Sequence, residues 1–220
     1  MKKRGKKLLL LGVVWEAIFA VWTVLIQMVD VQPAGQKGTD IGFATFNVWF
    51  HKLTGVHMGI YTITDWLGLV PLFVCVFFAG IGFVQLIKRR SLFQVDYDII
   101  LLGVYYAVVI LGYIIFEMIP INYRPILIEG RLEASYPSST TLLVLGVMPT
   151  LMEQMNRRLR NSMVKRTINI FTIAFSVYMV VGRLVCGVHW FTDIVGAVLL
   201  SGGLFCTYKA AVFLCYKKKN

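Results

Sequence analysis

Three ionisable residues interrupt an apolar run in the segment Gly182-Arg183-Leu184-Val185-Cys186-Gly187-Val188-His189-Trp190-Phe191-Thr192-Asp193. An ionisable residue at the centre of a membrane helix costs about 2.5–3.5 kcal/mol on insertion scales, so such residues usually face a polar cavity. We therefore interpret the segment as a polar turn between two membrane helices, and we expect its charged groups to carry the chemistry.

The spacing within this segment suggests a role for each group. If a helix begins near His189, then Asp193, four residues on, lies on the same face and can fix the imidazole tautomer. A turn at Gly187 would fold Arg183 back as a bidentate clamp for an oxyanion. We predict a nucleophile, its orienter and a phosphate clamp. The alternative is a buried structural His189–Asp193 pair, with Arg183 extending to the membrane interface.

The composition indicates an integral membrane protein. Of the 220 residues, 58% are hydrophobic and only 15% are charged, and the mean hydropathy is +0.73. The formal net charge is +11, but the basic residues fall in short clusters between apolar runs, which is typical of juxtamembrane loops, so no nucleic-acid partner is expected. The cysteines lack zinc-site spacing and are interpreted as small core residues: Cys75, Cys186, Cys206 and Cys215.

Six apolar runs predict an all-α membrane protein with six transmembrane helices, which we treat as one domain over residues 1–220. A signal peptide has an apolar core of only about 7–15 residues, so the first run is expected to be a retained helix. The runs are Leu8–Val29, Asp65–Leu86, Ile99–Ile119, Pro137–Met152, Ile168–Val181 and Phe191–Tyr216.

The basic clusters predict the orientation of these helices. With six crossings, the clusters at Met1–Lys7, Lys88–Arg90, Arg157–Arg166 and Lys217–Lys219 share one side, which the positive-inside rule makes cytoplasmic, together with both termini. The segments Asp30–Thr64, Pro120–Tyr136 and Arg183–His189 then meet on the outer face. The compact chain favours a bacterial plasma membrane, with the active site facing outside.

The aromatic stretch Phe43–Leu53 has two interpretations. It is either an amphipathic helix along the membrane surface or an ordinary segment of the aromatic belt. His51 and His57 are expected to be interfacial residues without chemistry.

The fourth run begins with a helix start that can bind phosphate. Pro137 suits the first helical turn, and the hydroxyls of Ser138 and Ser139 would lie beside free backbone amides. Taken alone, the same pattern describes an ordinary helix amino terminus.

Together, these segments resemble the superfamily of type 2 phosphatidic acid phosphatases and vanadium haloperoxidases, in its six-helix membrane lipid-phosphatase branch, over Glu117 to Asp193. Its motifs are K-x-x-x-x-x-x-R-P, P-S-G-H and S-R-x-x-x-x-x-H-x-x-x-D, in that order. The matching residues are Arg124 and Pro125, Pro137 and Ser138, and Arg183, His189 and Asp193. The departures are Glu117 for lysine, Ser139 for glycine, Thr140 for histidine and Gly182 for serine.

The resemblance implies a mechanism and a substrate class. His189 would attack phosphorus to give a phosphohistidine, oriented by Asp193, and water would then release phosphate from a phosphorylated lipid. The equatorial oxygens would be stabilised by Arg124, Arg183 and the Ser138–Ser139 helix start. Positioning and electrostatic stabilisation dominate phosphoryl transfer, so no metal and no cofactor are expected.

Thr140 stands where the family has its general acid, whose proton transfer is typically worth about 10²–10⁴-fold. Three explanations follow: a phosphate leaving group, as in a polyprenyl diphosphate; a proton from Glu117 or Glu133 in a lipid-facing cavity; or an impaired relative that binds lipid headgroups or a protein partner. Transfer of a phosphate-containing headgroup between lipids is another outcome.

Two further hypotheses concern single residues. Arg131 could swing into the site and replace the charge of the motif lysine. A small transporter or channel would need ionisable residues in several helices, of which only Glu16 is clear.

Overall fold

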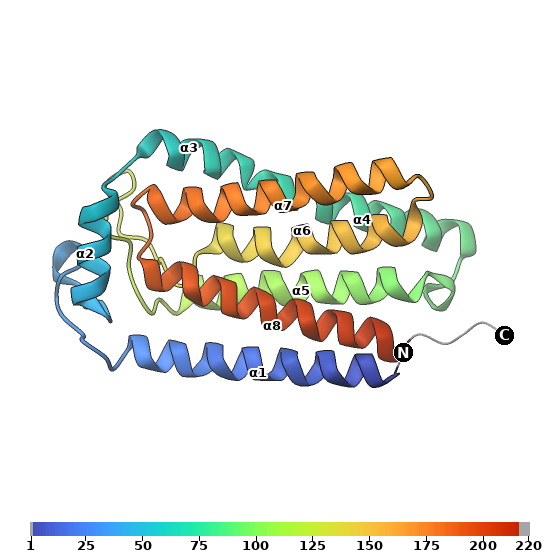
Figure 1. Ribbon diagram of the computed structural model, residues 1–220, viewed down its shortest axis with the longest axis horizontal. Helices are drawn as coiled ribbons and strands as arrows, with labels where there is room; N and C mark the ends of the chain where they lie inside the picture. The colour runs from blue at the N-terminus through green and yellow to red at the C-terminus, as the bar shows by residue number, and fades with distance from the viewer. Residues whose placement is uncertain (1, 216–220) are drawn as a thin grey trace.

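The computed structural model describes residues 2–215, and in this range it forms a helical bundle without β-strands (Figure 1). The basic cluster Lys217–Lys219 lies outside the described residues. Two 3-10 helices are η1 (Gln36–Gly38) and η2 (Leu92–Gln94). The α-helices are α1 (Lys2–Ile26), α2 (Ala44–Thr54), α3 (Met58–Leu67), α4 (Leu69–Arg89), α5 (Tyr97–Met118), α6 (Ser139–Arg158), α7 (Ser162–Val185) and α8 (Phe191–Cys215).

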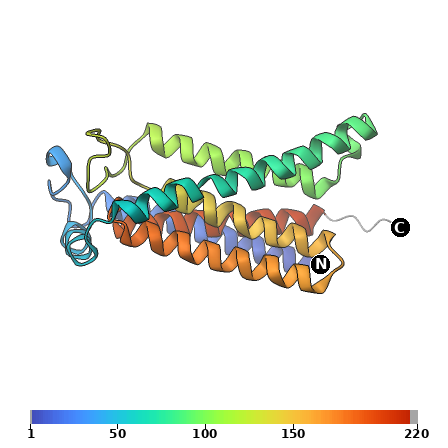
Figure 2. The same cartoon turned by 90° about the horizontal axis from the view of Figure 1, so that it is seen from above.

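Five helical segments in residues 2–215 are long and apolar enough to cross a membrane: α1, the α3–α4 unit (Met58–Arg89), α5, α7 and α8. Helix α6 does not meet this criterion, and its last two turns contain Glu153, Gln154 and Arg157. It packs against α4, α5, α7 and α8, so protein and not lipid surrounds most of it (Figures 1 and 2). A helix enclosed in this way needs no apolar outer surface, and a sixth crossing by α6 stays a prediction.

The predicted start of the second transmembrane run is wrong, because the observed helical unit begins earlier in the sequence. The helical unit begins at Met58 and not at Asp65, which lies in the last turn of α3. The first turns of α3 mix apolar residues with Gly59, Tyr61 and Thr62, so an apolar run does not reveal them. Asp65 therefore lies inside a helical unit, seven residues after its start, and not at the start of a transmembrane run.

Helices α1 and α8 run side by side along one edge of the bundle (Figure 1). Gly12 allows the close approach, because a Cβ there would lie 2.4 Å from Thr207 Oγ1. The Thr207 hydroxyl donates a hydrogen bond of 3.0 Å to Glu16 Oε1. Glu16 thus joins two helices, which weakens the transporter hypothesis that rested on it.

One end of the bundle holds the start of α1 and the α4–α5 and α6–α7 connections, as the basic clusters predict (Figure 1). The other end gathers the three polar segments predicted to meet. Gln36 Nε2 donates to the Pro125 carbonyl at 2.8 Å, and Trp190 Nε1 donates to the Tyr123 carbonyl at 2.8 Å. The candidate chemistry is therefore assembled at one end.

The cysteines are free thiols with different exposure. Cys186 is buried, and Cys75 and Cys206 are partly buried. Cys215 is exposed on the last turn of α8, so the interpretation of all four as core residues is wrong at this position.

Candidate active site

The turn between α7 and α8 presents His189. The backbone of this turn bends at Gly187, where φ is +76°, a conformation that favours glycine. A Cβ at this position would also lie 2.3 Å from the carbonyl oxygen of Gly55. The backbone at Gly187 thus packs tightly against the connection between α2 and α3, and the chain turns there as predicted.

Helix α2 lies across the end of the bundle and holds this turn from one side (Figure 1). Asn47 is fully buried and donates to Thr192 Oγ1 at 3.0 Å, and His51 Nε2 lies 3.1 Å from the Gly187 carbonyl oxygen. The opposite face exposes Phe46 and Trp49. The stretch is a helix, as one of the two interpretations proposed, and His51 has a structural contact.

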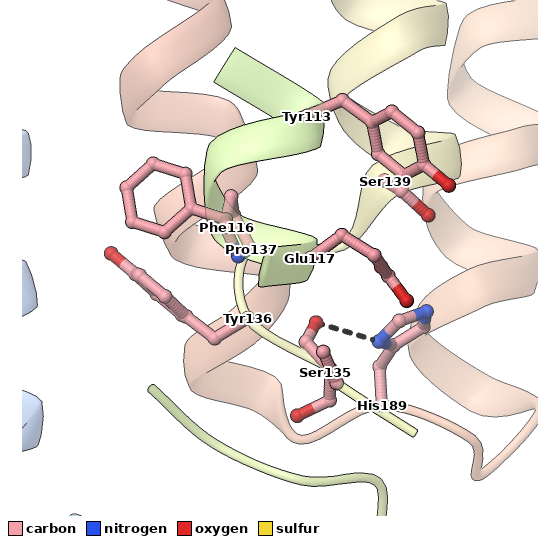
Figure 3. Close-up of a pocket in the computed structure, with 9 residues that line it drawn as sticks. Tyr113, Phe116, Glu117, Ser135, Tyr136, Pro137, Ser139 and His189 are labelled. Carbon is pink, nitrogen blue, oxygen red and sulfur yellow. Dashed lines mark hydrogen bonds between the residues drawn. The ribbon is translucent and has the colours of Figure 1, made fainter. Parts of the chain in front are cut away.

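The imidazole of His189 is buried, with only 4% of the residue exposed. Its Nδ1 lies 3.1 Å from the backbone carbonyl oxygen of Ser135 (Figure 3). Because a carbonyl only accepts hydrogen bonds, this contact assigns the proton to Nδ1. Nε2 is buried without a hydrogen-bond partner, so its lone pair is free for another group.

Asp193 caps the start of α8 behind the imidazole. Its Oδ2 accepts from the Trp190 backbone N–H at 2.8 Å and lies 3.7 Å from His189 Nδ1. Its Oδ1 faces Asn122 Nδ2 at 3.4 Å. Helix α8 begins at Phe191, two residues after His189, as predicted, and the carbonyl of Ser135 makes the shorter contact with Nδ1. Asp193 supplies a negative charge nearby.

Burial lowers the pKa of His189 to about 4, because a buried site disfavours the charged imidazolium. Asp193 raises this pKa, and the positive charges of Arg124 and Arg183 lower it. The imidazole is therefore neutral at pH 7, and both arginines lie close enough to act on it. A neutral ring with a free Nε2 has the state that a nucleophile needs.

Arg124 lies in the loop between α5 and α6 and pairs with Glu133. Arg124 Nε is 3.2 Å from Glu133 Oε2, and its backbone N–H donates to the Glu133 carbonyl at 3.0 Å. Arg124 Nη1 is buried without a hydrogen-bond partner. Nη1 is therefore available to an anion, whereas Nε and the carboxylate of Glu133 are engaged with each other.

Arg183 lies in the last turn of α7 and is 2% exposed. Its Nη2 donates to Asp65 Oδ1 at 2.8 Å and to the hydroxyl of Thr140, and its guanidinium carbon lies 5.1 Å from the ring centroid of Tyr61. Nε and Nη1 are buried and unpartnered. Buried polar groups are normally hydrogen-bonded, so these free N–H groups indicate an anion site.

A small cavity adjoins the imidazole (Figure 3). Its volume, counted as the space open to the centre of a water molecule, is about 10 Å³, which is roughly enough for one water. Figure 3 shows the carboxylate of Glu117 pointing towards the imidazole. The residues with polar side chains that line the cavity are Tyr113, Glu117, Ser135, Tyr136, Ser139 and His189. Of the two proposed proton donors, Glu117 lines this cavity and Glu133 does not.

Helix α6 starts two residues after the predicted start of the fourth run. Helix α6 begins at Ser139, so Pro137 precedes the capping residue Ser138 and does not occupy the first turn, because Ser138 has a non-helical ψ of 110°. The Ser138 hydroxyl donates to Thr141 Oγ1 at 3.0 Å, and its N–H donates to the Asp193 carbonyl at 3.2 Å. Ser139 faces the cavity and Ser138 holds the helix start.

Some residues fall outside the expected set. Arg131 lies at the exposed tip of a turn and does not line the cavity, so the structure does not bring it to His189. Asp65 and Asn47 were not predicted. Both lie outside the stretch that carries the family motifs, so no local pattern marks them. In the described part of the chain, no three His, Cys, Asp or Glu side chains are grouped to hold a metal ion.

Two arginines with unpaired, buried N–H groups act on a neutral imidazole at one end of a bundle of apolar helices, as expected of a multi-pass membrane protein that binds an anion. Residues 99–218 match the PAP2 superfamily. The match covers more than half of the chain, and the protein belongs to this superfamily, which confirms the resemblance seen in the motifs.

The fold is also similar to a solved structure, described as the crystal structure of the first transmembrane PAP2 type phosphatidylglycerolphosphate phosphatase from Bacillus subtilis. The TM-score is 0.65 and the sequence identity is 17%, over 94% of this chain and 98% of that chain. At this identity the likeness concerns the fold. No curated protein matches the sequence.

Proposed function

We propose that this protein is a lipid phosphatase that forms a phosphohistidine at His189. Membership of the PAP2 superfamily and the fold it shares with a phosphatidylglycerolphosphate phosphatase support a membrane lipid phosphatase. The observation that carries the mechanism is the buried, unpartnered Nε2 of His189, in a ring on which the charges of Arg124 and Arg183 act. Each of these arginines has a buried N–H group without a partner. An unpaired buried polar group costs about 1–3 kcal/mol, and a phosphate would supply the missing acceptors.

The first step forms the Nε2–P bond and breaks the bond from phosphorus to the lipid oxygen. Arg124 and Arg183 stabilise the equatorial oxygens, and the proton stays on Nδ1, which donates it in a hydrogen bond to the Ser135 carbonyl. The ring gains positive charge as it is phosphorylated. The carboxylate of Asp193, 3.7 Å from Nδ1, stabilises that charge.

Glu117 is the proton donor in this scheme, because its carboxylate lines the cavity beside His189. Thr140 is hydrogen-bonded to Arg183, and a hydroxyl does not serve as an acid at neutral pH. Glu117 gives its proton to the departing lipid oxygen. It then takes a proton from the water that attacks phosphorus, so that the P–N bond breaks and the neutral imidazole returns.

The substrate is a phosphorylated or diphosphorylated lipid of the outer leaflet of a bacterial plasma membrane. Basic clusters at the opposite end of the bundle support this orientation through the positive-inside rule. Attack on the terminal phosphorus of a polyprenyl diphosphate releases a polyprenyl phosphate, which departs without strong protonation. A polyprenyl diphosphate therefore depends least on Glu117.

The test is phosphate release by the purified protein from a lipid monophosphate and a polyprenyl diphosphate, with His189→Ala as the control. Release that is abolished in the variant supports the proposal. If neither lipid reacts, the impaired, lipid-binding relative takes its place. If lipid phosphate is consumed without free phosphate and a second lipid acquires it, the protein is a headgroup phosphotransferase.

A further inference from the structure

One face of α3 covers the buried guanidinium of Arg183. Tyr61, Asp65 and Gly68 follow one another at the spacing of a helical face. The ring centroid of Tyr61 lies 5.1 Å from the guanidinium carbon, and Asp65 Oδ1 lies 2.8 Å from Nη2. At Gly68, an added Cβ would lie 3.4 Å from Thr140 Cγ2. Helix α3 thus forms a wall of the site, although it lies outside the stretch that carries the family motifs.

Two residues that depart from the family motifs, Gly182 and Thr140, lie against this part of α3. A Cβ at Gly182, where the family has serine, would lie 2.7 Å from Thr64 Cγ2 on α3, so a side chain there requires a shift. Thr140, where the family has histidine, fits beside Gly68 and accepts a hydrogen bond from Arg183. The close approach of α3 accounts for the glycine at position 182.

Asp65 and Thr140 together determine which N–H groups of Arg183 remain free. Both accept from Nη2, and Nε and Nη1 stay buried and unpartnered. Arg183 is 2% exposed, whereas the side chain of Asp65 is 57% exposed. A buried guanidinium needs a counter-ion, and Asp65 supplies one from the edge of the site. Asp65 faces the guanidinium as an acceptor, which is the arrangement of an ion pair and not of a proton donor.

We propose that Asp65 is a positioning residue for Arg183: with Thr140 it holds Nη2 so that Nε and Nη1 point to the substrate phosphate. This inference rests on the proposed function, in which Arg183 clamps that phosphate. It assigns to Thr140 a new role at the histidine position, as the second anchor of the arginine.

The variants Asp65→Asn and Asp65→Ala separate positioning from other roles, with the exposed Asp40→Ala as a control on the outer loops. The amide oxygen of asparagine still accepts from Nη2, so Asp65→Asn should keep kcat within about threefold of the parent. Asp65→Ala frees the guanidinium and should lower kcat by about 10–100-fold, with a smaller change in KM, because misplacement by about 1 Å can cost 100-fold. Asp40→Ala should match the parent.

Binding of orthovanadate, measured by titration calorimetry, gives a second readout that needs no turnover. Asp65→Ala should weaken binding by about tenfold or more, and Asp65→Asn should bind at least as tightly as the parent, because a negative charge is removed. If both variants lose activity and binding equally, or if Asp65→Ala loses neither, Asp65 does not position Arg183. A parent that binds vanadate without releasing lipid phosphate refutes the proposed function alone, and the binding series then decides this inference.

Discussion

The Nδ1 atom of His189 lies 3.1 Å from the carbonyl oxygen of Ser135, although the two residues are 54 positions apart in the chain. The contact connects the turn before α8 to the segment before α6. It holds the proton on Nδ1, so the free Nε2 is the atom that can attack phosphorus. The chemistry of the site therefore depends on how these two segments are held together.

The protonation of His189 gives the first prediction. Its pKa is lowered to about 4 from 6.5, so the unfolded chain takes up the proton first as the pH falls. The stabilising contribution of the neutral ring is complete above pH about 6.5 and is lost as the pH falls towards 4. In ¹⁵N-histidine NMR spectra, the His189 signal is assigned by its absence from the His189→Gln variant. Its chemical shift should still be that of a neutral imidazole at pH 5. A midpoint near pH 6.5 would contradict the buried site.

Glu117 gives the second prediction. Glu117→Gln removes the proposed proton donor without a large change in shape. We expect kcat for a lipid monophosphate to fall about 10²-fold or more, within the usual range for general acid catalysis. With a polyprenyl diphosphate the fall should be much smaller, because the leaving group is itself a phosphate. Equal losses on both substrates in steady-state assays would rule out this role.

The third prediction concerns the turn at Gly187. Gly187→Ala places a Cβ 2.3 Å from the Gly55 carbonyl oxygen, in a backbone conformation with φ of +76°. Gly38→Ala is the matched control, since its φ is also +76° and no atom lies within 4 Å. Backbone strain alone costs about 1–3 kcal/mol, so Gly187→Ala should lower the unfolding temperature more and abolish activity. Equal shifts in thermal unfolding would show that the Gly55 contact does not matter.

Asn47 gives the fourth prediction, on the link between α2 and the catalytic turn. Asn47→Ala leaves the Gly42 carbonyl and the Thr192 hydroxyl without their donor, at a cost of about 1–3 kcal/mol. We expect lower stability and a reduced kcat. The exposed Trp49→Ala, whose ring contacts are with Phe46 and Phe50 of the same helix, serves as the control for stability in detergent. Unchanged kcat in Asn47→Ala would mean that α2 does not support the turn.

The sequence predicts most of the fold because helices that face lipid follow a simple rule, which is that they need a long apolar run. Helices α1, α5, α7 and α8 follow this rule. Their apolar runs match the observed helices within a few residues, except that α1 and α7 begin six residues earlier. Helix α6 departs from the rule because other helices surround it. Met58–Thr64 departs from it because this stretch packs near α7 and carries small and polar residues.

The site is predictable only where a motif marks it. Arg124, Arg183 and His189 are identified from the motifs, but Asp65 lies 118 positions from Arg183, and no local pattern connects the two. The same limit applies to Arg131, whose sequence position suggested a place near the helix start. A turn between Ile128 and Arg131 instead leaves it at the exposed tip.

The central claim is that His189 carries the phosphate during turnover. Brief incubation with a lipid labelled with ³²P at its phosphate, followed by alkaline denaturation and peptide mapping, tests it directly. We predict acid-labile label on the peptide containing His189, and none in His189→Ala, which should also release no phosphate. Phosphate release that continues in His189→Ala, with no label trapped in the parent, would contradict the account.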